Sequence, residues 1–187
     1  MDQPLLGKTI AILVANGFEE TEMTEPQRAL LKSGAKLKVI SPEQGLVNGW
    51  HGKAWGHYFP VDEQITDVLA ADYDMLILPG GERSVAKLKQ NAHTRRIVGS
   101  FLDGGKPIAA IDDGIDLLVF VDKIKGRTIA APENLHGAVE TAGGQVVEEP
   151  VAVDKNLITG YDQDNLPAFV EQVVKSFLEA VSVKKAA

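Results

Sequence analysis

The chain contains no cysteine among its 187 residues. This absence excludes disulfides, thiolate zinc sites and any reaction that needs a thiol. The chain also has no apolar run close to the roughly 20 residues that a membrane span needs. Its first residues lack the basic start and apolar stretch of a signal peptide. We therefore expect a cytoplasmic protein with no membrane partner.

Positive charge is also scarce, since 19 Lys and Arg stand against 26 Asp and Glu and give a net charge of −7. The basic residues are scattered rather than gathered in a stripe, which argues against a nucleic-acid partner. The hydrophobic share of 44% and the charged share of 24% are ordinary for a globular protein. We expect a single domain over 1–187, with 182–187 as a frayed tail or the start of a linker.

Short apolar runs rich in β-branched residues alternate with turn signals and helical stretches. The predicted strands are 8–14, 37–40, 75–78, 107–111, 128–130, 151–153 and 157–159, with a glycine-rich excursion at 45–61. The predicted helices are 24–34, 62–70, 84–102 and 115–121, one that ends at 143–144, and 166–181. This alternation predicts an α/β fold, a three-layer sandwich around a doubly wound, mostly parallel sheet.

Ligands of an open parallel sheet bind outside the carboxyl ends of its strands. The loops 15–23, 79–84 and 112–114 follow three of the predicted strands, so we expect them to converge on one crevice. The last of these is a tight strand-to-helix turn. A turn of this kind exposes one side chain at a helix N-terminus, and here that side chain belongs to Asp112.

An ordered series of motifs spans almost the whole chain. It comprises NGFEETE (16–22), SP (41–42), GW (49–50), FPVD (59–62), ADYD (71–74), LPGG (78–81), GKPIAAI (105–111), KGR (125–127), AGG (142–144), LIT (157–159), Asp164 and LPAF (166–169). In these motifs the chain resembles the ThiJ/PfpI family, which includes intracellular protease I and glyoxalase-like and chaperone-like stress proteins. The resemblance implies a flavodoxin-like, glutamine amidotransferase-like fold.

The resemblance also shows what has been replaced. After the strand that ends at Ile111 the family reads Cys-His-Gly-Pro, whereas this chain continues with Asp112, Asp113 and Gly114. Protease-like members use an acidic residue a few positions after the Gly-Gly turn, contributed across a subunit contact, and this chain offers Val85 and Ala86 there. The nucleophile, its histidine and the assisting acid are therefore all absent.

The family's glutamate that matches Glu22 lies beside the cysteine and binds it most strongly once the sulfur is oxidised to sulfinate. A carboxylate has the charge and the paired oxygens of a sulfinate, so we expect Asp112 to imitate an oxidised cysteine. The helix N-terminus and amides near Gly80, Gly81 and Asp113 should favour its ionised form. Glu22 would then be the protonated partner of a carboxyl pair.

Other interpretations of the same residues remain open. Asp112 and Asp113 could cap the following helix without any chemistry. Glu22, Asp112, Asp113 and a histidine could form a cation site, although the spacing matches no known ligand pattern. His51 and His57 could line a pocket rim or bind a metal, or they could simply lie on the surface.

The favoured hypothesis is a non-catalytic homologue, a stress-associated binding or chaperone-like protein that needs no cofactor and no metal. Its pocket would include Gly80, Gly81, Asp113 and Gly114 and would hold a small molecule beside Asp112. The alternative is a hydrolase or a glyoxalase- or deglycase-like enzyme that uses Asp112 or Glu22 on a small carbonyl or amide substrate. The resemblance implies a homo-oligomer, a dimer or hexamer, with Trp50, Trp55, Tyr58 and Phe59 as interface candidates.

Overall fold

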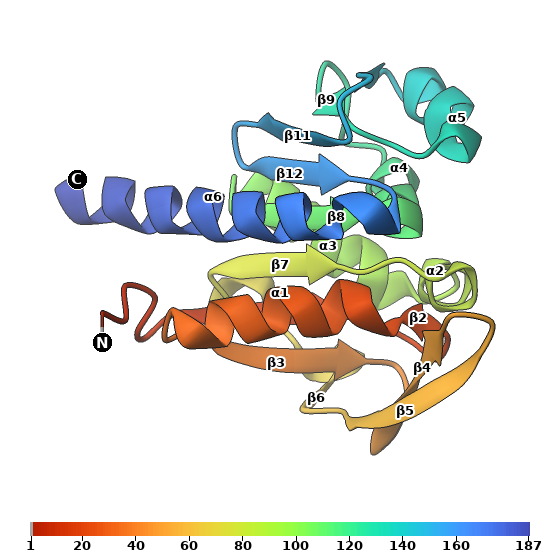
Figure 1. Cartoon of the computed structure of the whole chain (residues 1–187), viewed down its shortest axis with the longest axis horizontal. Helices are drawn as coiled ribbons and strands as arrows, with labels where there is room; N and C mark the ends of the chain where they lie inside the picture. Colours follow the sequence, from red (N-terminus) through yellow and green to blue (C-terminus); the bar gives the residue numbers. More distant parts are fainter. Residues whose placement is uncertain (1) are drawn as a thin grey trace.

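A computed structural model describes residues 2–187 as an α/β sandwich around a seven-stranded sheet with the order β11-β12-β8-β7-β1-β3-β6 (Figure 1). These strands are β1 (Thr9–Leu13), β3 (Lys36–Ser41), β6 (Glu63–Gln64), β7 (Met75–Leu78), β8 (Ile108–Ile111), β11 (Val151–Asp154) and β12 (Leu157–Gly160). All neighbours are parallel except β11, which runs antiparallel to β12. The predicted fold class is confirmed.

Helices cover both faces of the sheet. Helices α1 (Glu20–Lys32) and α6 (Leu166–Ala186) lie side by side on one face (Figure 1). The other face carries α2 (Glu82–Lys89), α3 (Ala92–Asp103), α4 (Ile115–Val121) and, at the β11 edge, α5 (His136–Thr141). Strands buried on both faces read as continuous apolar runs, which is why β7 and β8 were recognisable in the sequence.

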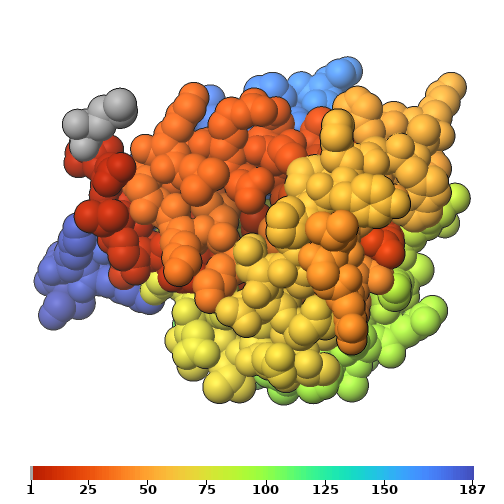
Figure 2. Space-filling model, turned by 90° about the horizontal axis from the view of Figure 1, so that it is seen from below, coloured from red at the N-terminus to blue at the C-terminus, as the bar shows by residue number. Residues whose placement is uncertain are grey.

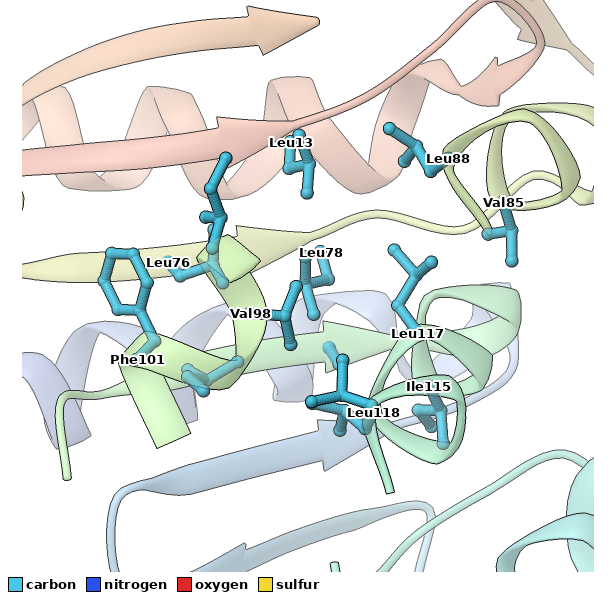
Figure 3. Packing of buried hydrophobic residues seen from close by; sticks show 14 of the residues in the cluster. Leu13, Leu76, Leu78, Val85, Leu88, Val98, Phe101, Ile115, Leu117 and Leu118 are labelled. Carbon is cyan, nitrogen blue, oxygen red and sulfur yellow. The ribbon is translucent and has the colours of Figure 1, made fainter. Parts of the chain in front are cut away.

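Each face has its own hydrophobic core. Under α1 and α6, Leu30, Phe169 and Phe177 pack against inward side chains of the sheet. On the other face, Leu76, Leu78, Val98, Phe101 and Leu118 are among the residues that interlock between the sheet and α2, α3 and α4 (Figure 3). The two cores fix the strands in register and therefore fix the loops at their carboxyl ends.

Two smaller sheets stand outside the central one. One contains β2 (Phe18–Glu19), β4 (Leu46–His51) and β5 (Ala54–Pro60), and the other pairs β9 (Thr128–Ile129) with β10 (Gln145–Val146). The segment 45–61 was predicted only as a glycine-rich excursion, but it forms the antiparallel β4–β5 hairpin. Figure 2 shows the light-orange atoms of this hairpin at the end of the molecule opposite the C-terminal end of α6.

Several predicted boundaries were wrong. The segment 62–70 is not a helix but β6 followed by short 3-10 turns, because the Asp62 carboxylate accepts the Val39 amide instead of capping a helix. Helix 84–102 is two helices, since Asn91 caps a new one. The last helix continues to Ala186, so the residues predicted to fray are helical up to that point.

Helix α1 begins at Glu20, four residues before the predicted start at residue 24. Two acidic residues, Glu20 and Glu22, lie in its first turn, where the helix dipole favours negative charge. This earlier start makes Glu22 a helix residue at the edge of the site rather than part of a loop.

Candidate functional site

Three loops meet at the carboxyl ends of β1, β7 and β8, at the end of the sheet where the strand arrows point in Figure 1. The Glu19 amide donates to the Gly80 carbonyl oxygen at 3.0 Å. The Gly81 amide donates to the Asp113 carboxylate at 3.3 Å. The loops 15–23, 79–84 and 112–114 are thus in direct contact, as the sequence predicted.

Asp112 occupies a constrained turn between β8 and α4. Its φ of 50° lies in the left-handed region, which costs a non-glycine residue about 1–2 kcal/mol. Two residues later, a Cβ on Gly114 would lie 2.2 Å from the Leu78 carbonyl oxygen, so only glycine fits there. The elbow inferred from the sequence is therefore present.

Glu22 lies beneath this elbow with 1% of its surface exposed. Its Oε1 accepts the Gly80 amide at 2.8 Å, and its Oε2 accepts Gln163 Nε2 at 2.7 Å. Burial raises the pKa of Glu22 well above its usual range, and a hydrogen bond with the Asp112 carboxyl and the charge of that group raise it further. Glu22 and Asp112 line the same pocket, and the raised pKa of Glu22 favours its protonated form.

The amide donors near Asp112 differ from those predicted. Gly80 and Gly81 donate to Glu22 and Asp113, not to Asp112. Asp112 Oδ1 instead accepts the amide of Asp162 at 2.8 Å, from the loop that follows β12. The hydrogen bond between Asp162 and Asp112 depends on the left-handed backbone at Asp112 and on the arrangement of the loop after β12. Neither could be predicted from the sequence.

The capping interpretation is wrong for both aspartates, because no side chain caps the 3-10 turn 112–114 or α4. The Asp113 carboxylate faces the Gly81 amide across the crevice. Burial raises the pKa of Asp113, the Gly81 amide opposes this, and the neighbouring Asp112 charge adds to it.

These groups line a pocket of about 470 Å³. Its lining residues are Glu19, Glu22, Gly52, Gly81, Asp112, Asp113, Pro132, Asn134 and Gln163. Four of them carry carboxyl groups and none is basic. Burial also raises the pKa of Glu19, against the opposing effect of His51. Of the predicted pocket residues, Gly80 and Gly114 shape the backbone around this space without lining it.

Val85, at the position expected for the assisting acid, is buried in the core beneath α2. Ala86 lines a second pocket of about 480 Å³ next to the first, together with Glu82 and Asp113. Asp113 and Asn134 belong to both linings, so the two pockets are neighbours. Of the α2 residues that share this pocket with Asp113, Glu82 carries a carboxyl group, whereas Val85 and Ala86 do not.

The histidines of the hairpin lie against a different glutamate. Nδ1 of His57 is 3.1 Å and Nδ1 of His51 is 3.8 Å from Glu20 Oε2, while both rings are largely exposed. Burial would raise the pKa of Glu20, but hydrogen bonds from His57 outweigh it and lower the pKa. Across residues 2–187 no group of three or more His, Asp or Glu side chains is arranged to hold a metal ion. The cation-site interpretation therefore gains no support.

The sequence reasoning missed Asp162 and Gln163, which contact Asp112 and Glu22 respectively. A signal for them existed. They follow the predicted strand 157–159, which is parallel to β8, so their loop had to emerge at the same edge of the sheet. The crevice predicted from the sequence included only the loops after the first, third and fourth predicted strands.

Comparisons with known proteins concern the chain as a whole. The model of the DJ-1/PfpI family matches residues 8–176. The chain is 33% identical over 172 residues to "Protein/nucleic acid deglycase 2" of Escherichia coli K12, covering 91% of this chain and 98% of that protein. It is 34% identical over 166 residues to "General stress protein 18" of Bacillus subtilis 168, covering 88% of this chain and 94% of that protein.

Among solved structures, a two-domain protein of Anabaena variabilis with DJ-1/ThiJ/PfpI-like and ferritin-like domains superimposes with a TM-score of 0.83 at 26% identity. The match covers 90% of this chain and 47% of that longer one. In the described residues 2–187 no helix has both the length and the apolar character to cross a membrane.

Proposed function

Because this chain belongs to the DJ-1/PfpI family, we propose that it is a member without thiol catalysis, in which Asp112 serves as a fixed anion in the inherited pocket. The observation that carries the proposal is that Asp112 and the buried Glu22 line one pocket, with Asp112 Oδ1 held by the Asp162 amide at 2.8 Å. A carboxylate held in this way has the charge and the two oxygens of a sulfinate, so Asp112 resembles an oxidised cysteine.

The replacement of the neighbouring groups supports the same proposal. A carboxylate cannot form the hemithioacetal of thiol-dependent glyoxalase chemistry. Asp113 stands where the family has histidine, and its carboxylate is engaged with the Gly81 amide. Gly80, the other amide donor of the turn, is engaged with Glu22. The Gly80 and Gly81 amides, two of the candidates for stabilising an oxyanion, are therefore already bound to side chains of this chain.

The proposed role is binding, in the manner of a stress-associated or chaperone-like protein, with a small molecule in the acidic pocket. The relative named "General stress protein 18" supports the association with stress. Four carboxyl groups around about 470 Å³ favour a ligand that presents hydrogen-bond donors and disfavour another anion.

The central test is an assay of the purified protein with glyoxals and with peptides. We expect no turnover above that of Asp112→Asn. Turnover that Asp112→Asn abolishes would overturn the proposal.

The double variant Asp112→Cys with Asp113→His tests whether the pocket is inherited. We expect the introduced thiol to react with iodoacetamide faster at pH 6 than a thiol introduced by Asp103→Cys, which is exposed and distant from the pocket. The helix N-terminus and the new imidazole should favour the thiolate. Equal rates for the two thiols would contradict an inherited thiol-activating pocket.

A second candidate is a carboxylate enzyme, because Glu22, whose pKa is raised by burial, lines the same pocket as Asp112. A carboxyl group with a raised pKa can act as a general acid. The relative named "Protein/nucleic acid deglycase 2" suggests a carbonyl adduct as substrate for this candidate. The same Asp112→Asn comparison decides between the two.

Homo-oligomerisation is part of the proposal. Trp55 and Tyr58 of the β4–β5 hairpin are 52% and 68% exposed, which suits aromatic side chains at an interface. Sedimentation analysis of the wild type and of Trp55→Ala with Tyr58→Ala should show a dimer or hexamer that the double substitution weakens. A monomeric wild type would contradict this part.

A further inference from the structure

Gln163 begins the 3-10 turn 163–165 between β12 and α6. Its Nε2 donates to Glu22 Oε2 at 2.7 Å, and its Oε1 accepts the Thr21 hydroxyl at 2.9 Å. The side chain itself is exposed, whereas Glu22 is buried, so Gln163 lies between Glu22 and solvent. Gln163 therefore contacts the Glu22 carboxyl through its side-chain amide.

Two of the polar neighbours of Glu22 can donate a hydrogen bond to its carboxyl group but cannot accept a proton from it. The Gly80 amide is a donor only, and Gln163 presents its N–H₂ group, also a donor, because its carbonyl oxygen is turned to Thr21. A proton on Glu22 cannot be given to either of them. The remaining acceptor beside this carboxyl in the pocket is Asp112, which also raises the pKa of Glu22.

We propose that Gln163 is a positioning residue that directs the Glu22 proton toward Asp112, by presenting a donor where an acceptor would draw that proton away. This inference rests on the carboxyl pair of the proposed function and adds how the pair is kept in one protonation arrangement. An oxygen at the position of Nε2 would compete with Asp112 for the proton. The hydrogen bond between the two carboxyls would then weaken.

The same loop holds the other member of the pair. The amide of Asp162, the residue before Gln163, donates to Asp112 Oδ1 at 2.8 Å. Asp162 has a φ of 74°, and its own carboxylate accepts the Asp164 amide at 3.2 Å, which stabilises this left-handed turn. Two consecutive residues of the loop therefore fix the Asp112 and Glu22 carboxyls relative to each other.

The charges around Glu22 reinforce the role. Glu19 of β2 and Asp112 of the elbow raise its pKa, and Asp113 and Asp162 add further carboxylates nearby. The pocket lining contains no Lys, Arg or His. The proton on Glu22 is therefore what limits the repulsion, and its placement decides whether Asp112 keeps its partner.

Carboxyl carbon and side-chain amide resonances of labelled protein, followed by NMR over a pH titration, test this directly. Glu22→Gln identifies the Glu22 carboxyl signal. In the wild type, the Nε2 protons of Gln163 should shift with the same midpoint as the Glu22 carboxyl carbon. Amide protons that ignore the ionisation of Glu22 would overturn the proposal without any variant.

Two substitutions separate proton placement from packing. Gln163→Leu removes the donor, so the ionised Glu22 loses a hydrogen bond and its midpoint should rise by roughly half a unit to one unit. Gln163→Glu introduces an acceptor of the same size, so the Glu22 signal should titrate in two coupled steps. Gln172→Leu is the matched control, since Gln172 lies on α6 and bonds only Ser176.

Unchanged midpoints in Gln163→Leu and Gln163→Glu, or identical curves for the two, would refute the role. An upward shift in Gln163→Leu with coupled steps in Gln163→Glu, and neither in Gln172→Leu, would support it. Turnover that depends on Asp112 would overturn the proposed function and leave these titrations as they are. The two failures are therefore distinguishable.

Discussion

The substitution Glu22→Gln should change how the stability of the protein depends on pH. A glutamine has the size of a protonated glutamate and carries an N–H₂ group that can donate to Asp112, but it cannot ionise. The free energies of unfolding of the wild type and the variant should therefore be most alike under acidic conditions. The two free energies should diverge as the pH rises.

The sign follows from the raised pKa of Glu22 in the folded protein. Between the ordinary Glu value of about 4.3 and the folded value, the folded state keeps the proton and the unfolded state has lost it. The free energy of unfolding of the wild type then falls by about 1.4 kcal/mol for each pH unit, and that of the variant does not fall from this source.

Urea denaturation followed by far-UV circular dichroism from pH 5.5 to 8.5 measures this difference. Glu19 and Asp113 also have raised pKa values, but they are present in both proteins and largely cancel when the curves are subtracted. Glu25→Gln is the control, because Glu25 lies on the same helix one turn later and forms an exposed ion pair with Arg28. Parallel curves for the wild type and Glu22→Gln would refute the buried, protonated glutamate.

Three further substitutions test other parts of the structure. Gly81→Ala should destabilise the fold by more than about 2 kcal/mol, since φ is 107° and the new Cβ would lie 2.4 Å from the Gly17 carbonyl oxygen; a melting temperature near that of the wild type would contradict this. Asp154→Asn should cost about 1–2 kcal/mol at neutral pH, because the Thr128 amide and then Arg127 lower the pKa of Asp154. That loss should vanish in urea titrations as the pH falls below the depressed pKa, and a loss that persisted there would argue against the ion pair. Phe101→Ala, at a fully buried site, should cost about 3–5 kcal/mol in chemical denaturation, and a loss under 1 kcal/mol would mean that the core closes around the gap.

The central sheet could be predicted because its strands are covered on both faces. Segments such as Met75–Leu78 and Ile108–Ile111 are wholly apolar, and that pattern needs no tertiary information. The β4–β5 hairpin could not be recognised in the same way, because most side chains of β5 face solvent and the segment lacks an alternating apolar face. The segment 62–70 was wrongly predicted as a helix, because the partner of the Asp62 carboxylate is the Val39 amide, which is distant in the sequence.

The rule that parallel strands end at one edge predicted that the loops of Glu22 and Asp112 converge, and the pairing of these two residues was implied by the family resemblance. The donors around the pair were not predictable, because they depend on positive φ angles at Asp112 and Asp162 that no residue type demands. A loop after β12 could have been expected at this edge, but not that its consecutive residues would bind the two carboxyls. The composition of the site could thus be inferred, while its hydrogen bonding required the structure.

The chain has two tryptophans, and both lie in the β4–β5 hairpin, with their rings 5.4 Å apart and the Arg83 guanidinium 4.5 Å above Trp50. Gly52, in the turn of that hairpin, lines the acidic pocket. The tryptophan emission of the protein therefore originates from a single hairpin beside the site. A change in tryptophan emission on adding a compound would signal an event at the pocket mouth, whereas tryptophan emission recorded during unfolding would report the surroundings of this hairpin.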